Sequence, residues 1–225
     1  MRHFVVYPSA KPEIAIVCAE KWTKAGYSVH VMLDKGVLGA SPWCYFVNCQ
    51  QDRFPGYYRV INELVAQAFK RGADLVTCIG DDMLPPHEAH AEAVALMYFS
   101  KFPDGFGVMQ ATGDPQGKDD QGVQAAARIC GSPTFGRGWF ERGYGGKGPF
   151  CEEYRSFYSD EDLWNVARKS EVLYLEPRLT IFHNHWSWGH MKKQEYHNAA
   201  QNNWGLDKLT FERRQKEGFP GWEPK

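Results

Sequence analysis

The sequence lacks any apolar stretch long enough to cross a membrane, and its N-terminus shows no pattern typical of a cleavable signal peptide. Its first residues lead directly into a predicted strand at 4–7. No two of its six cysteines form a C-x-x-C pair, and their spacing matches no zinc site. These absences predict a cytoplasmic protein with no integral membrane segment and with free thiols in a reducing compartment.

The sequence also lacks a strong charge of one sign, since the formal net charge is −1 over 225 residues. This balance does not indicate a nucleic-acid-binding protein, although it leaves room for a local basic patch. Aromatic residues, in contrast, are abundant at 15%, and eight of them are tryptophans. Most tryptophans are expected in the core, and a few around a cleft would suit a sugar or a base.

Short β-forming runs alternate with segments of helical periodicity in the first half of the chain. The hydrophobic pattern predicts strands at 4–7, 27–33, 45–48 and 74–79, and helices at 13–25 and 59–71. Such alternation is typical of a mostly parallel, Rossmann-like sheet flanked by helices. The sequence therefore predicts an α/β fold.

Polar residues directly follow several of the predicted strands. Ser9, Asp34 and the pair Asp81-Asp82 occupy such positions. In open α/β sheets the ligand binds outside the carboxyl ends of the strands. We therefore expect these side chains to lie together at one edge of the sheet.

The second half of the chain has a different character. Glycines crowd the segment 131–148, which we expect to be loop-rich and mobile, and which lacks the spacing of a phosphate-binding P-loop. A helix is expected over 159–169, and strands are expected at 171–175 and 179–185. The remaining tail is polar and predicted to be partly helical.

The pair Asp81-Asp82 lies at the tip of the predicted strand at 74–79. Adjacent carboxylates repel each other unless a positive charge lies between them, and a divalent cation is the usual solution. A solvated acidic turn, or capping by Asp82 ahead of Pro85, explains the pair equally well. The pair alone does not decide between these interpretations.

Two later motifs also place acids and histidines close together. Asp160 and Asp162 fall in the first turn of a predicted helix, where acids also serve simply to stabilise the helix dipole. His183 and His185 are two apart on a predicted strand, so both imidazoles face one side and are able to bind one metal ion. Two structural histidines near a strand end are the alternative.

In their order and spacing, these motifs resemble the family 2-type glycosyltransferases of the GT-A fold over most of the chain. In that family a glycine followed six residues later by an asparagine opens a helix, as Gly56 and Asn62 do here. A D-x-D motif then ends a strand, and here Gly80-Asp81-Asp82 takes its place with glycine for the first acid. The later glycine-serine stretch, glycine-rich loop and E-D-x-D-L-type motif correspond to Gly131-Ser132, Gly145-Gly146 and, with serine for the first acid, residues 159–163.

The resemblance implies a GT-A glycosyltransferase domain at 1–190, followed by a C-terminal polar helical tail at 191–225. The domain would comprise a nucleotide-sugar-binding half at 1–105 and an acceptor and catalytic half at 106–190. The implied activity is metal-dependent, inverting transfer of a hexosyl group from a nucleotide-diphosphate-sugar to an acceptor hydroxyl. A UDP-sugar is the expected donor, and a saccharide, glycoconjugate or other hydroxylated molecule is the expected acceptor.

The same resemblance assigns roles to individual residues. Mn²⁺ or Mg²⁺ is expected to bind Asp82 and Asp81 together with a late histidine, His183 or His185. The catalytic base is expected to be Asp160 in the register that aligns Leu163, or Asp162 if the alignment slides. The residues expected to contact the nucleotide-sugar are Pro8, Ser9, Asp34, Gly56, Arg59, Asn62, Asp81, Gly131, Ser132 and Trp139.

Three other hypotheses account for parts of the same pattern. The fold could glycosylate a hydroxymethylated nucleobase in DNA, as some phage glycosyltransferases do, and the basic residues Lys192, Lys193, Arg213 and Arg214 permit this. The acids and histidines could instead form the zinc site of a metal-dependent hydrolase, with His87 and His90 as further ligands. Loss of the two family acids, at Gly80 and Ser159, would also fit a sugar-binding module without turnover.

Overall fold

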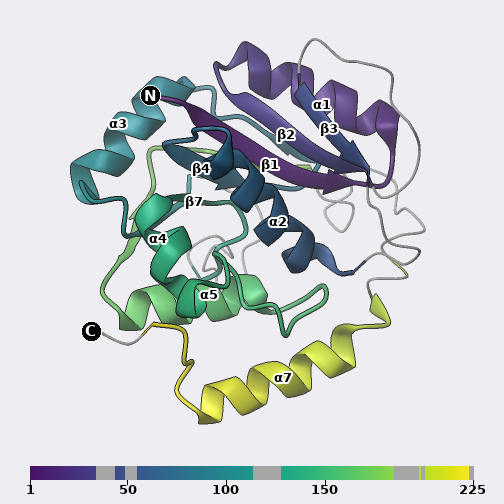
Figure 1. Cartoon of the computed structure of the whole chain (residues 1–225), viewed down its shortest axis with the longest axis vertical. Coiled ribbons are helices and arrows are strands. Elements are labelled where there is room, and N and C mark those ends of the chain that lie inside the picture. Colours follow the sequence, from purple (N-terminus) through teal and green to yellow (C-terminus); the bar gives the residue numbers. More distant parts are fainter. Residues whose placement is uncertain (34–43, 49–54, 114–127, 185–197, 199–200, 223–225) are drawn as a thin grey trace.

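The computed structural model describes residues 1–33, 44–48, 55–113, 128–184, 198 and 201–222. A seven-stranded sheet in the order β3-β2-β1-β4-β7-β6-β8 forms its centre (Figure 1). Its strands are β1 (His3–Ser9), β2 (Ser28–Leu33), β3 (Cys44–Asn48), β4 (Leu75–Cys78), β6 (Val108–Ala111), β7 (Pro133–Gly136) and β8 (Leu173–Glu176). All neighbouring pairs are parallel except those of β7, which runs antiparallel to both β4 and β6.

Helices cover both faces of this sheet, so a central strand is apolar on both sides. Phe4 and Val6 of β1 belong to one core cluster, while Val5 and Tyr7 belong to the other. This division follows from the two-residue period of a strand. The helices are α1 (Pro12–Lys24), α2 (Tyr57–Lys70), α3 (Ala91–Lys101), α4 (Arg137–Arg142), the 3₁₀ helix η2 (Gly143–Gly146), α5 (Ser159–Lys169) and α7 (Trp204–Lys216).

The predicted fold class is confirmed: the chain forms an α/β domain with a mostly parallel central sheet flanked by helices, consistent with a Rossmann-like GT-A fold. The helices expected at 13–25, 59–71 and 159–169 correspond to α1, α2 and α5 within two residues. The strand expected at 179–185 is shorter than predicted. Within its described part, 179–184, the strand is limited to β9 (Phe182–His183), which pairs with β5 (Met83–Leu84) in a separate two-stranded sheet.

The prediction of a loop-rich segment at 131–148 was wrong, because β7, α4 and η2 occupy most of it. Its glycines serve close packing. A Cβ atom on Gly138 would stand 2.8 Å from the carbonyl oxygen of Asp104, and one on Gly136 would stand 2.8 Å from the Cα of Gly105. The start of α4 therefore lies directly against the turn before β6.

The C-terminal helix α7 packs against the domain through polar and aromatic contacts. It contributes Asp207 and Arg214 to the interior, where these side chains are almost completely buried. The predicted boundary between domain and tail, at 190–191, lies outside the described residues. None of the described helices combines the length and the apolar character that a membrane span requires.

Candidate active site at the carboxyl end of β4

The site begins where the buried strand β4 ends and the chain turns toward β5. The backbone amide of Met83 donates to the carbonyl of Gly80 at 3.2 Å and closes this turn. A Cβ atom on Gly80 would stand only 2.6 Å from Oδ1 of Asp82. Glycine at this position therefore leaves room for the Asp82 carboxylate to fold back over the turn.

The first acid of the pair, Asp81, is tied to the end of the neighbouring strand. The hydroxyl of Ser9, the last residue of β1, donates to Oδ2 of Asp81 at 2.6 Å. Burial raises the pKa of Asp81 to about 6, and the nearby charge of Asp82 adds to this effect, while the Ser9 hydrogen bond opposes it. The expectation that Ser9 and Asp81 meet at one sheet edge is confirmed.

The second acid, Asp82, faces a histidine from a distant segment. Nε2 of His183 lies 3.3 Å from Oδ2 of Asp82, and the amide of Asn184 donates to the Asp82 carbonyl at 2.9 Å. The pairing of β5 with β9 brings these residues together. The two side chains are 11% and 30% exposed, for Asp82 and His183 respectively, so an ion or a ligand is able to reach them.

The first turn of α2 lies between the end of β4, which carries Asp81 and Asp82, and Asp160. The hydroxyl of Tyr57 donates to the carbonyl of Ile79 at 2.8 Å, and the hydroxyl of Tyr58 donates to Oδ1 of Asp160 at 3.3 Å. Burial raises the pKa of Tyr57, and the negative charges of Asp82, Asp160 and Asp81 raise it further. The negative charges of these three carboxylates therefore all act on Tyr57.

Asp160 has the environment of a carboxylate that is able to accept a proton. It is half-buried in the first turn of α5, and its Oδ1 also accepts the Glu161 amide at 3.0 Å. Burial raises the pKa of Asp160, whereas the hydrogen bonds from Glu161 and Tyr58 and the charge of His183 oppose the rise. A carboxylate with a raised pKa is a stronger base than an exposed aspartate.

Asp162 lies in the same helical turn, but its carboxylate points into the core. It is fully buried, and Arg214 binds it in a bidentate manner, at 2.6 Å from Nε to Oδ2 and 3.0 Å from Nη2 to Oδ1. The hydroxyls of Tyr144 and Tyr154 donate to the same carboxylate at 2.8 and 2.9 Å. Four donated hydrogen bonds leave it no position to act on a substrate, so of the two acids only Asp160 remains a candidate base.

Three residues expected to contact the donor hold the loop that follows η2. Gly56 has φ of +111°, and a Cβ atom there would stand 2.9 Å from the carbonyl oxygen of Arg155. Asn62 donates to the carbonyl of Phe150 at 3.0 Å and accepts its amide at 3.2 Å, while Nε of Arg59 donates to the Glu152 carbonyl. The structure thus gives Gly56 and Asn62 a role in packing.

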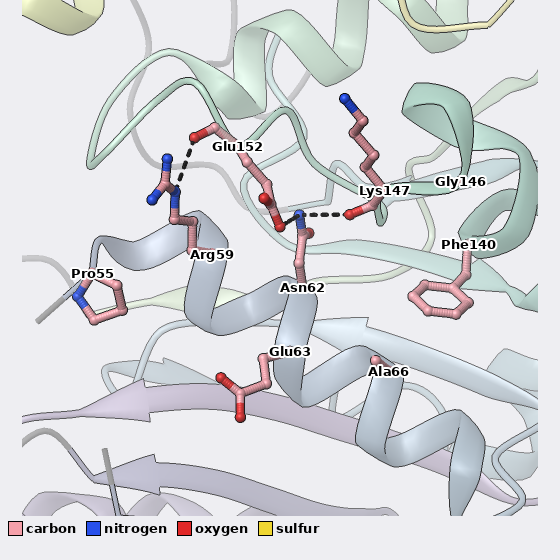
Figure 2. A pocket seen from close by; sticks show the side chains of 9 residues that line it. All are labelled: Pro55, Arg59, Asn62, Glu63, Ala66, Phe140, Gly146, Lys147 and Glu152. Carbon is pink, nitrogen blue, oxygen red and sulfur yellow. Dashed lines mark hydrogen bonds between the residues drawn. The ribbon is translucent and has the colours of Figure 1, made fainter. Parts of the chain in front are cut away.

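An open groove of about 470 Å³ lies between α2 and this loop. In Figure 2, Arg59 and Asn62 reach from α2 toward the segment that carries Lys147 and Glu152. The groove is lined by Pro55, Arg59, Asn62, Glu63, Ala66, Phe140, Gly146, Lys147 and Glu152. Its lining includes none of Asp81, Asp82 and Asp160, so it is distinct from the candidate active site.

The remaining predicted donor contacts are distributed unevenly. Pro8 precedes Ser9 at the end of β1 and is half-buried, and Gly131 is half-buried beside Ser132. Ser132 is buried and hydrogen-bonded to Gln110. Trp139 is fully buried and donates to the carbonyl of Pro149, so its ring has no face open to a ligand, and it is not part of the site.

Two predicted site residues, Asp34 and His185, lie outside the described residues. Of the late histidines, His183 is thus the one whose position is described. Tyr57 and Tyr58 were missed as site residues by sequence reasoning. The available signal in the sequence was the aromatic pair directly after Gly56, the glycine that opens α2.

The donor atoms present fit a cation that is shared with a ligand. Among the described residues, no group of three or more histidine, cysteine, aspartate or glutamate side chains is able to hold a metal ion. Asp82 and His183 supply two donors, and Mg²⁺ commonly binds one or two carboxylates while ligand phosphates complete its shell. His87 and His90 are exposed at the surface near α3, and they do not add to this pair.

Comparisons with known proteins were made for sequence and for structure. No protein-family model matches the sequence, and no curated protein sequence matches it. Among solved structures, the chain is similar to a glycosyltransferase involved in the glycosylation of the major capsid of PBCV-1, with 8% identity and a TM-score of 0.38 over 63% of each chain. It is also similar to a UDP-glucose pyrophosphorylase complexed with UDP-glucose, with 12% identity and a TM-score of 0.30 over 49% of this chain and 57% of that one. The matched region spans less than two thirds of either structure.

Proposed function

We propose that this protein is a metal-dependent glycosyltransferase that moves a hexosyl group from a nucleotide-diphosphate-sugar to an acceptor hydroxyl. The observation that carries the proposal is the convergence of three carboxylates and a histidine at the carboxyl end of β4. Asp82 and His183 form a pair 3.3 Å apart, while Tyr57 donates to the Ile79 carbonyl at the end of β4 and the neighbouring Tyr58 donates to Asp160. This edge is where ligands bind in open α/β sheets.

The chain's own residues divide the work between holding the donor and moving a proton. Asp82 and His183 would hold the divalent cation, with Asp81 near them in the chain, and the Ser9 hydroxyl fixes the orientation of Asp81. When bound, Mn²⁺ or Mg²⁺ supplies positive charge that offsets the charge on the departing nucleoside diphosphate. Pro8 and Ser9, at the end of β1, would contact the nucleoside part of the donor.

Asp160 acts as the general base in this proposal. Its carboxylate accepts the proton of the acceptor hydroxyl while that oxygen bonds to the anomeric carbon and the bond to the diphosphate breaks. Tyr58 keeps the carboxylate oriented through its hydrogen bond to Oδ1. Attack from the face opposite the leaving group inverts the anomeric configuration, so the product is expected to have the configuration opposite to that of the donor.

The acceptor in this proposal is a saccharide or another hydroxylated molecule. Transfer to a modified base in DNA gains no support from two of the four basic tail residues. Arg214 is buried against Asp162, and Arg213 pairs with Glu153 and Glu217. Lys192 and Lys193 lie outside the described residues. The hydrolase hypothesis likewise gains no support from His87 and His90, because these exposed residues do not join Asp82 and His183 in a metal-binding group.

The first test is a thermal-shift screen of UDP- and GDP-linked hexoses, with Mn²⁺ or with EDTA. A donor at a hundred times its Kd is expected to add about 2.7 kcal/mol of stability. Asp82→Ala is expected to abolish the metal-dependent part of this shift. The matched control is Asp104→Ala, which removes an exposed aspartate before β6, at the opposite edge of the sheet.

The two possible results lead to different conclusions. Stabilisation by one donor that requires the metal, survives Asp104→Ala and is lost in Asp82→Ala supports the proposed function. If no nucleotide-sugar stabilises the wild type and Zn²⁺ alone does, the glycosyltransferase proposal is wrong and a hydrolytic metal site replaces it.

A further inference from the structure

The backbone just before Asp160 is held by a carboxylate from the far end of the chain. Asp207, near the start of α7, is 2% exposed. Its Oδ1 accepts the amide of Arg155 at 3.0 Å, and its Oδ2 accepts the amides of Ser156 and Phe157 at 2.8 and 2.9 Å. One buried carboxylate therefore binds three consecutive backbone amides.

This arrangement has two features of a specific anchor. Hydrogen bonds to an ionised carboxylate are shorter and stronger than those between neutral groups. Three such bonds from one segment restrict both its position and its orientation. The segment 155–157 belongs to no helix or strand that would supply hydrogen-bond acceptors for these amides. The Asp207 carboxylate supplies those acceptors instead.

The anchored segment leads directly to the proposed base. Tyr158 follows it in a left-handed conformation, with φ of +69°, and its ring packs on Trp204 and Phe211 of α7. A tyrosine adopts this conformation only where the surroundings hold it. Asp160 comes two residues later in the first turn of α5, so the direction in which α5 begins depends on these contacts with α7.

The same segment is also joined to the residues on the other side of Asp160. The amide of Tyr57 donates to the carbonyl of Arg155 at 2.8 Å, and the hydroxyl of Tyr58 donates to Asp160. Displacement of the segment 155–157 would therefore move the start of α2 relative to the start of α5. The distance between Tyr58 and Asp160 would change with it.

We propose that Asp207 is a positioning residue for Asp160, acting through the three amides of Arg155, Ser156 and Phe157. The C-terminal helix is then part of the machinery that orients the base, rather than a tail. Asp207 touches no reacting atom and acts only through the backbone. The role of Asp160 as a base rests on the proposed function. The contacts of Asp207 with the three amides are independent of that function.

The test compares Asp207→Asn with Glu212→Gln. Both substitutions replace one carboxylate of α7 by an amide, and Glu212 is exposed to solvent, where it forms an ion pair with Lys208. The side-chain nitrogen that Asp207→Asn introduces cannot accept an N–H, so one of the two acceptor positions is lost. The readout is the side-chain carboxyl ¹³C resonance of Asp160 in protein made with ¹³C-labelled aspartate, assigned by its absence in Asp160→Asn.

We expect Asp207→Asn to move the Asp160 resonance and Glu212→Gln to leave it in place. With a UDP-hexose that stabilises the wild type, Asp207→Asn is also expected to lower turnover by about 10²-fold while donor affinity is kept, because displacement by about 1 Å costs this much. If Asp207→Asn does not fold, Asp207→Glu keeps the charge and shifts the oxygens by one methylene. The Asp160 resonance is then expected to move in that variant.

A role of Asp207 in stability alone would give a different result. The folded variant would melt at a lower temperature, but the Asp160 resonance and the turnover would remain those of the wild type, and the proposal would be overturned. If no nucleotide-sugar binds the wild type at all, the proposed function fails, whereas the resonance still decides whether Asp207 positions Asp160.

Discussion

The molecule has two pairs of aspartates near its candidate site, one at the end of β4 and one in the first turn of α5, and the comparison between them separates chemistry from architecture. At the end of β4, Asp81 is bound by a neutral hydroxyl and Asp82 lies beside a partly exposed histidine. In α5, Asp160 receives a tyrosine hydroxyl, whereas Asp162 is paired with a buried arginine.

The nature of the partner distinguishes the four acids. An arginine that forms two short hydrogen bonds in the core saturates a carboxylate and fixes it permanently. A serine or tyrosine hydroxyl orients a carboxylate but leaves most of its acceptor capacity for a ligand. Of the four, only Asp162 is removed from chemistry in this way. The distinction depends on burial and on the counter-charge, and it is invisible in the spacing of the acids.

The largest expected effect comes from breaking the pair in the core. Asp162→Ala would leave Arg214, which is 4% exposed, without its bidentate partner, since the exposed Glu153 lies 3.5 Å away, and would also remove the acceptor of Tyr144 and Tyr154. We expect a loss of about 3–5 kcal/mol in the free energy of unfolding, because one partner of a buried ion pair is removed. Urea denaturation of the variant and the wild type measures this loss.

The neighbouring acid supplies the control for that experiment. Asp160→Asn removes the same charge from the same helical turn, where no arginine among the described residues pairs with it. We expect a change in unfolding free energy below about 1 kcal/mol, as for most substitutions outside the core. Equal losses for the two variants would show that the contrast between Asp160 and Asp162 is mistaken.

A smaller effect concerns two histidines, His183 and His3, which differ in burial as Asp160 and Asp162 do. His183 is partly exposed at the site, whereas His3 is 3% exposed inside the domain. One ring nitrogen of His3 lies 3.2 Å from the Ala91 carbonyl, which accepts only, so Nδ1 carries the proton and Nε2 accepts the Thr77 hydroxyl. Burial lowers the pKa of His3 to about 4 from 6.5.

The sign of the pH dependence follows from this lowered pKa. The unfolded chain binds the His3 proton more tightly than the folded chain does. The contribution of His3 to the free energy of unfolding is therefore complete above about pH 6.5 and declines as the pH falls toward 4. The decline from His3 is roughly 3 kcal/mol, at about 1.4 kcal/mol per unit of pKa difference. Urea denaturation across this range measures it. In His3→Gln we expect that part of the slope to vanish, and an unchanged slope would contradict the assignment.

The smallest effect is a shift in a pH profile. Tyr58→Phe removes a hydrogen bond that favours the ionised form of Asp160 and so opposes the rise of its pKa. Without it the pKa of Asp160 rises further. The acidic limb of kcat/KM against pH is therefore expected to move to higher pH. An acidic limb that stays in place would show that Tyr58 does not act on the base.

Much of the site-bearing half of the fold was predictable from the sequence. Helical periodicity located α1, α2 and α5, and the rule that parallel strands end at one edge placed Ser9 beside Asp81. These predictions depend on local pattern and on the geometry of parallel sheets, both of which can be read along the chain.

The rest depends on contacts between distant segments. Glycines at 136 and 138 indicated a loop, although they permit close packing against the turn before β6. The choice between Asp160 and Asp162 was open because Arg214 lies 52 residues away from Asp162. Likewise, nothing near Asp207 in the sequence indicates that it binds the amides before α5. Pairing across such separations is determined by tertiary packing and has no local pattern.

The most direct test of the account uses Asp160→Asn and the UDP-hexose that stabilises the wild type. Titration calorimetry gives the donor affinity, and release of nucleoside diphosphate gives the turnover, both on the same preparation. The account predicts a donor affinity within about twofold of the wild type and a turnover lower by roughly 10²–10⁴-fold. Turnover that survives the substitution, or donor binding that disappears with it, would contradict the assignment of Asp160 as the base.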